Sequence, residues 1–127
     1  MKTLYRNIFF ISLAIIMWLS VVPASYIPNI AALSFLTDKN INFLIFLYLS
    51  SLGLLSRFTL SNIYLLIAIF SFGLIIEIIH FYHPYRYFEL ADLAANSLGI
   101  LLASFIFQKK IKLSIDLYYF DLNYCLS

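Results

Sequence analysis

The sequence predicts an all-α integral membrane protein, a bundle of about four transmembrane helices. Composition is the first observation: of 127 residues, 64% are hydrophobic and 11% are charged, and the mean hydropathy is +0.97. A soluble domain usually carries about a quarter charged residues, because its surface must be hydrated. The scarcity of charge is explained if lipid is the main solvent. The other two observations are four apolar stretches and the placement of lysine and arginine between them.

The four apolar stretches have lengths close to that of a spanning helix, which needs about 17–25 mainly apolar residues. They cover roughly residues 5–22, 41–55, 60–79 and 90–107. The second stretch is short, and local thinning of the bilayer would accommodate it. The first stretch has an alternative interpretation as a cleaved signal peptide, because Lys2 and Arg6 precede it and Val22-Pro23-Ala24 is an acceptable cleavage site. A retained helix agrees better with the charge pattern.

Basic residues predict the orientation, because lysine and arginine near helix ends favour the cytoplasmic side. They lie before the first stretch, between the second and third, and after the fourth: Lys2, Arg6, Arg57, Lys109, Lys110 and Lys112. Both termini are therefore expected in the cytoplasm, and the loops 23–40 and 80–89 outside. Residues 1–112 would form the transmembrane domain, and residues 113–127 a cytoplasmic tail. Alternating apolar positions from Ile111 to Leu117 favour a short strand or a membrane-apposed tail there.

Two carboxylates, Glu77 and Asp92, lie at or just inside predicted helix ends. A charge at the centre of a spanning helix costs about 2.5–3.5 kcal/mol on insertion scales, so each should face protein, water or a cation. His80 is three residues after Glu77, which places both on one helix face. Small residues predict close helix contact in the fourth stretch, where they recur every four positions: Ala95, Gly99 and Ala103.

The predicted topology brings polar residues from three chain regions to the outer face. The candidate ligand-binding residues are Asp38, Lys39, Glu77, His80, Arg86, Asp92 and Asn96. Two interpretations stay open: a closed ion-pair network, such as Arg86 with Glu77 or Asp92, and an open binding or catalytic site. One histidine with two carboxylates is weak support for a metal, so neither a metal nor a cofactor is expected. The absence of a basic stripe argues against nucleic-acid binding.

These residues resemble the VanZ-like family of small bacterial membrane proteins. The stronger segment is Glu77-Ile78-Ile79-His80, followed by Pro84, Arg86, Asp92, Asn96 and Gly99, with Ala103 four residues further on. The family pattern reads Glu-x-x-Gln, then Arg, then Asp-x-x-x-Asn-x-x-Gly. The weaker segment, residues 37–43, is similar to the family's Asp-Lys-x-x-His-Phe element. His80 and Asn42 depart from the family's Gln and His. The resemblance covers roughly residues 5–107.

The resemblance implies a bacterial inner-membrane location and an envelope-related accessory role, since the family's namesake is associated with teicoplanin resistance. It implies no defined reaction. The leading hypothesis is a non-enzymatic protein that binds a polar lipid or glycolipid headgroup, or a membrane protein partner, through the outward polar cluster. The alternatives are an enzyme acting on a lipid-linked substrate, with Glu77 or Asp92 as general base, and a structural subunit of a larger complex. Homo-oligomerisation is also possible.

Overall fold

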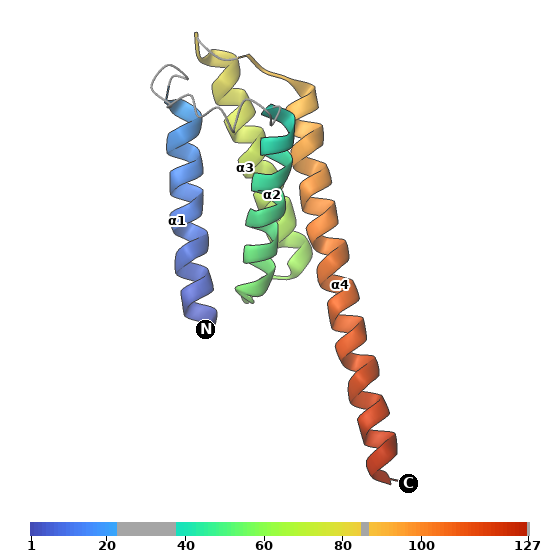
Figure 1. Ribbon diagram of the computed structural model, residues 1–127. Coiled ribbons are helices and arrows are strands. Elements are labelled where there is room, and N and C mark those ends of the chain that lie inside the picture. The colour runs from blue at the N-terminus through green and yellow to red at the C-terminus, as the bar shows by residue number, and fades with distance from the viewer. Residues whose placement is uncertain (23–37, 85–86, 127) are drawn as a thin grey trace, which may run out of the picture.

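The computed structural model describes residues 1–22, 38–84 and 87–126, and these residues form four helices and no strand (Figure 1). Helix α1 comprises Lys2–Val21, α2 Asp38–Leu55, α3 Asn62–Tyr82 and α4 Leu90–Leu126. The all-helical prediction is confirmed. Three helices, α1, α3 and α4, are long and apolar enough to cross a membrane, whereas α2 is a shorter apolar helix. This indicates a membrane protein.

Successive helices run in opposite directions, so alternate helix ends lie together (Figure 1). We call the end that holds Lys2, Leu55 and Asn62 the base of the bundle, and the opposite end, which holds Val21 and Leu90, the head. The first residue lies at the base, and the last helix runs past the base, so both ends of the chain are on the same side of the bundle.

The helix ends follow from local chemistry. Arg57, just after α2, has a φ of 44°, the left-handed conformation that often follows a helix C-terminus. Helix α3 ends at Tyr82, and the extended residue after it, His83, directly precedes Pro84, which disfavours helical backbone in the residue before it. The helix continues beyond Ile79, where the apolar stretch ends, so His80 lies on α3 and not in the following loop.

Helix α4 approaches the backbone of α2 closely at Gly99. A Cβ atom built on Gly99 would lie 2.5 Å from the backbone oxygen of Phe43 and 2.9 Å from the backbone nitrogen of Leu47. Ala95 and Ala103, one turn to either side of Gly99, are buried as well. The small residues therefore let the two backbones approach, as small-residue interfaces do in membranes. The apolar core beside this contact contains Phe9, Phe46, Leu49, Leu52, Leu54, Leu65, Ile69 and Ile100.

Arg6 fastens α1 to the end of α2 at the base. Its Nε donates to the backbone oxygen of Ser56 at 3.2 Å, and its Nη2 donates to that of Arg57 at 2.8 Å. The guanidinium also lies over the ring of Phe58, 5.3 Å from its centroid. Carbonyl groups at a helix C-terminus lack partners within the helix and carry partial negative charge, so a cation there is favourable.

Replacing Arg6 with alanine should lower the free energy of unfolding by about 1–2 kcal/mol, because two charge-assisted hydrogen bonds are lost at a partly exposed site. Thermal unfolding of the purified protein in detergent measures this. Lys2→Ala is the matched control, since Lys2 is an exposed base residue of the same helix. Equal melting temperatures for the two variants would contradict the role given to Arg6.

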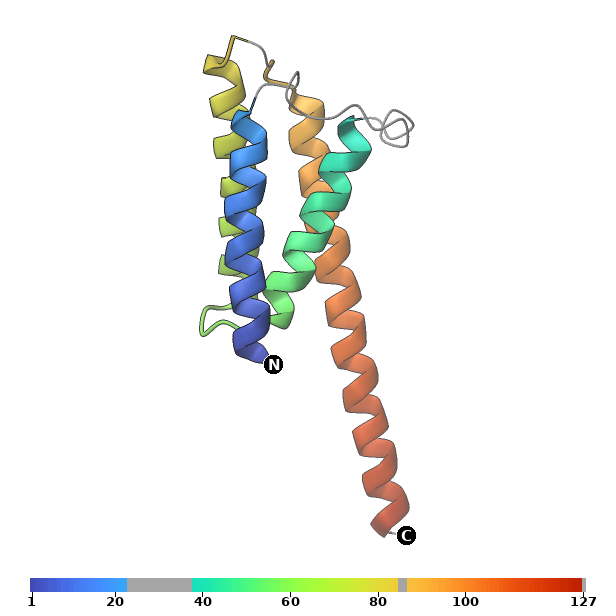
Figure 2. The same ribbon diagram turned by 60° about the vertical axis from the view of Figure 1, so that its left-hand side comes forward.

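Helix α4 leaves the bundle at Gln108, which lies across from Asn62, the first residue of α3, in the groove between these helices. Figure 2 shows α4 continuing alone beyond the other helices. Of the two alternatives predicted for Ile111 to Leu117, the short strand is wrong, because these residues are helical. We call residues 111–126 the α4 extension. Every residue of the α4 extension is exposed.

Candidate functional site

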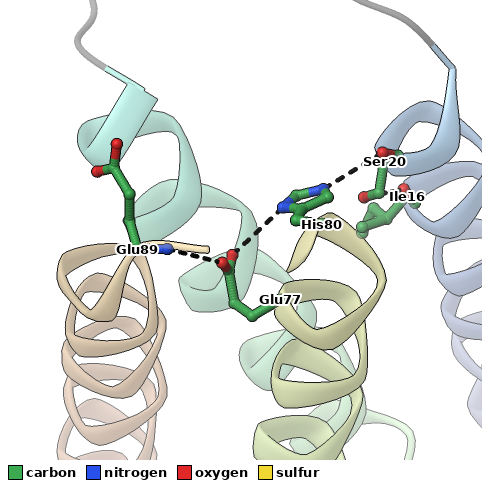
Figure 3. Close-up of polar contacts among 5 residues, drawn as sticks. All are labelled: Ile16, Ser20, Glu77, His80 and Glu89. Carbon is green, nitrogen blue, oxygen red and sulfur yellow. Dashed lines mark hydrogen bonds and ion pairs between the residues drawn. The ribbon is translucent and has the colours of Figure 1, made fainter. Parts of the chain in front are cut away.

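Glu77 and His80 form the centre of the polar cluster at the head of the bundle (Figure 3). The two residues are 2% and 8% exposed. Oε1 of Glu77 lies 3.6 Å from Nδ1 of His80, and Oε2 accepts a hydrogen bond from the backbone N–H of Glu89 at 3.4 Å. Nε2 of His80 lies 3.2 Å from the backbone oxygen of Ser20. The pair on α3 therefore contacts α1 on one side and the start of α4 on the other.

The contacts of His80 restrict where its protons lie. The oxygen of Ser20 can only accept, so Nε2 carries a proton and donates it. Nδ1 then faces a carboxyl oxygen of Glu77, and two bare lone pairs would repel each other. A proton on the imidazole or on the carboxyl group makes this 3.6 Å contact attractive. In both cases the pair is neutral overall, which reduces the cost of burying it.

Asn96 occupies the next position inward, between α4, α2 and α3. It is 2% exposed, and its Nδ2 lies 3.0 Å from where a Cβ on Gly73 would be. The position of a Cβ atom on Gly73 would also be 2.8 Å from the ring of Phe46. Gly73 thus makes room for both side chains. Asn96 lies one turn from Gly99, so it is enclosed by the same close contact of α4 with α2.

Lys39 and Glu89 form the exposed part of the cluster. Nζ of Lys39 lies 3.8 Å from Oε2 of Glu89, and the two side chains are 55% and 53% exposed. An ion pair this exposed contributes little stability. It does place one cation and one anion at the rim of the head, where α2 and α4 begin.

The remaining predicted residues are placed less centrally. Asp92 lies in the first turn of α4, where a carboxylate interacts favourably with the positive end of the helix. Arg86 lies outside the described residues. Asp38 begins α2, but its side chain is outside the described part of the chain. The ion pair considered between Arg86 and Glu77 or Asp92 therefore cannot be placed. The carboxylate of Glu77 instead has the two contacts given above.

Three side chains of the cluster, Glu77, His80 and Asn96, are buried. Two grooves lie elsewhere: an apolar one between α1 and α3 near Phe9 and Phe72, and one between α3 and α4 near Phe70 and Ser104. Neither is lined by Glu77, His80, Asp92 or Asn96. Across the described residues, no group of three or more His, Cys, Asp or Glu side chains could hold a metal ion. The geometry of Glu77 and His80 is suited to fastening helices together.

Sequence reasoning missed two features of this bundle. In the sequence Arg6 indicates only orientation or a signal peptide, and its contacts with Ser56 and Arg57 use backbone oxygens, which leave no pattern in the sequence. The α4 extension had a detectable signal. No glycine or proline occurs between Gly99 and Leu126, so nothing in that stretch would end a helix.

Comparison with known protein families, curated proteins and solved structures gives no match for the chain. The family resemblance read from the sequence therefore stays a prediction, and the function is argued from the residues and their geometry.

Proposed function

We propose that the chain is a non-enzymatic, four-pass protein of the bacterial cytoplasmic membrane that has an envelope-related accessory role and binds a membrane protein partner. One observation carries the proposal: α4 has 37 residues, whereas α1 and α3 have 20 and 21. At 1.5 Å per residue, α4 is about 55 Å long and a spanning helix about 30 Å. Helix α4 thus extends well beyond the thickness of a membrane.

The composition of the α4 extension favours a protein partner. Its exposed large side chains are Ile111, Leu113, Ile115, Leu117, Tyr118, Tyr119, Phe120, Leu122, Tyr124 and Leu126. Apolar surface of this extent on a water-exposed helix is unfavourable, and such patches mark interaction sites. A helix that stands free of its own bundle also gains stability when a partner covers it.

The charge distribution supports placing the α4 extension in the cytoplasm. Arg6 and Arg57 lie at the base, and Lys109, Lys110 and Lys112 follow the point at which α4 passes it. Basic residues concentrate on the cytoplasmic side of membrane proteins. We therefore infer that the base and both chain ends are cytoplasmic and that the head faces outward.

The closed geometry of Glu77 supports a non-enzymatic role. A general base must come within hydrogen-bond reach of the proton that it removes. Glu77 is 2% exposed and both of its carboxyl oxygens face groups of the protein itself. A substrate would have to open the head before it could reach this carboxylate.

A second candidate function is recognition of an anionic lipid or glycolipid headgroup at the head. The observation that favours it is the exposed ammonium group of Lys39 at the start of α2. Glu89, which is paired with Lys39 and half-exposed, would then orient the lysine or accept hydrogen bonds from sugar hydroxyls. The resemblance to VanZ-like proteins agrees with such an envelope ligand.

Photo-crosslinking in native membranes tests the leading proposal. A benzoylphenylalanine at Tyr118, an exposed aromatic position of the α4 extension, should give protein adducts on irradiation. The same group at Asp116, which lies between apolar faces, is the control and should give markedly fewer. If neither position gives a protein adduct, the α4 extension has no protein partner and the proposal fails.

A further inference from the structure

Along one face of α4, the spacing between successive residues alternates between four and three. We call these residues the α4 seam: Ser97, Leu101, Ser104, Gln108, Ile111, Ile115, Tyr118 and Leu122. All lie in α4, and none is buried. We propose that two copies of the chain associate in parallel through the α4 seam. This inference rests on the proposed function and names the partner, a second copy of the chain.

The residue types in the α4 seam differ between the part above the base of the bundle and the part below it. Above the base three of its four residues, Ser97, Ser104 and Gln108, are small or polar and the fourth is Leu101, whereas below the base it begins with Ile111 and Ile115. In lipid, apolar side chains gain nothing by association, so small and hydrogen-bonding residues join helices. In water, burial of apolar side chains drives association. Each half of the α4 seam therefore has the residue types that join helices in its own environment.

The spacing of the α4 seam is that of a coiled coil. Steps of four and three give a repeat of seven residues, which keeps one face of a helix turned toward a partner helix. From Ser97 to Leu122 the seam covers more than three such repeats, about 38 Å of helix. Lys109, Lys110, Lys112, Asp116 and Asp121 all lie off the seam, so no charge interrupts it.

Gln108 favours a second copy over a different partner. A carboxamide group has both donors and an acceptor, so two glutamines related by a twofold axis can hydrogen-bond to each other. All copies insert into the membrane in the same direction, so two seams meet in parallel and Gln108 faces Gln108. A single buried amide at such a position fixes the register of a parallel coiled coil.

The bundle leaves room for a neighbouring helix along the membrane part of the α4 seam. A groove of about 460 Å³ lies between α3 and α4. Ser97, Leu101, Ser104 and Gln108 form its α4 wall, and apolar residues of α3, among them Leu66 and Phe70, form part of the other. The same α4 face thus borders an unfilled groove in the membrane and is exposed below it.

The opposite face of α4 cannot serve a second copy in the same way. Its membrane part, centred on Gly99, is already covered by α2, whose backbone leaves no space there. Lys110 then interrupts this face before Leu113, Leu117 and Phe120. The α4 seam, by contrast, carries no charged residue from Ser97 to Leu122.

Cysteine crosslinking of the full chain in native membranes tests the inference. In a Cys125→Ser background, Tyr118→Cys places a thiol on the α4 seam and Leu117→Cys places one on the opposite face. The two positions are 65% and 57% exposed, so random collision would affect them similarly. A disulfide requires Cα atoms within about 7 Å. Mild oxidation should give about fivefold more crosslinked dimer for Tyr118→Cys, because only seam positions meet in the coiled coil.

A second substitution separates specific association from collision. Ile115→Asp, on the α4 seam, should abolish crosslinking of Tyr118→Cys, whereas Leu113→Asp, on the opposite face, should leave it unchanged. Equal crosslinking at positions 117 and 118, or no dimer at either, would overturn the inference. A photo-adduct at Tyr118 with a mass other than twice 14.7 kDa would also overturn it and leave the proposed function standing. Absence of any adduct would remove both.

Discussion

Replacing Gly99 with alanine is expected to push α2 away from α4 and to lower the free energy of unfolding by roughly 1–3 kcal/mol, the range for overpacking a filled core. The new methyl group would lie 2.5 Å from the backbone oxygen of Phe43 and 2.9 Å from the backbone nitrogen of Leu47. Backbone atoms cannot rotate away as side chains do, so the helices themselves must move. Thermal unfolding in detergent and the yield of monodisperse protein measure the effect.

Gly53→Ala is the control for the Gly99 substitution. A Cβ on Gly53 would meet only side-chain atoms, of Phe9, Leu65 and Ile69, at 3.1–3.3 Å. These side chains can shift by a few tenths of an ångström, so the melting temperature should fall less. If Gly53→Ala destabilises the protein as much as Gly99→Ala, the contact of α4 with the backbone of α2 is no tighter than the packing around Gly53.

Replacing Glu77 with alanine is expected to lower the free energy of unfolding by about 3 kcal/mol, because removing one partner of a buried pair leaves the other without its compensation. The N–H of Glu89 and Nδ1 of His80 both lose the carboxyl group that they face. The start of α4 and the end of α1 should then separate from α3. Chemical or thermal unfolding in detergent measures the change.

Glu77→Gln should retain most of this stability. Its amide oxygen can accept from the N–H of Glu89, and its amide nitrogen can donate to Nδ1 of His80. Glu89→Ala is the second control, because it keeps the backbone N–H and removes only a half-exposed side chain. If Glu77→Ala unfolds at the same temperature as the unaltered protein, the Glu77–His80 pair does not hold the head together, and a ligand-binding role for Glu77 becomes the better explanation.

Much of the membrane part of the fold could be predicted, because lipid imposes simple rules. Long apolar stretches predict the four helices, and most of the helix ends lie within a few residues of the predicted ends. The polar and small positions of α4, such as Asn96 and Gly99, are buried against α2 and α3. Their spacing identified one face of the helix, although the sequence did not say which neighbouring helix would cover it.

The α4 extension was not predicted, because apolar residues at every second position fit two structures. From Ile111 to Leu117 they suit a strand with one apolar face and also a helix with two apolar faces. The residues that precede this segment decide between the two structures. A helix already formed in the membrane can continue into this segment without a new nucleation step. The environment of the preceding residues, and not the local pattern, determines its structure.

The partners of His80 were equally beyond prediction, because they depend on the relative positions of three helices. The spacing of Glu77 and His80 placed them on one face of α3, and that face could have met a side chain, a lipid or a ligand. It met the backbone of Ser20 on α1.

The contacts that fasten α1 and α4 to their neighbours have a consequence for how the sequence can vary. Three side chains bind main-chain atoms in these contacts: Arg6 binds the oxygens of Ser56 and Arg57, Glu77 binds the nitrogen of Glu89, and His80 binds the oxygen of Ser20. Every amino acid supplies the oxygen, and every one but proline supplies the N–H. Tolerance to mutation should therefore be one-sided. Arg6, Glu77 and His80 would accept few replacements, whereas the four positions they bind would accept many, including glycine at Arg57, where φ is already positive.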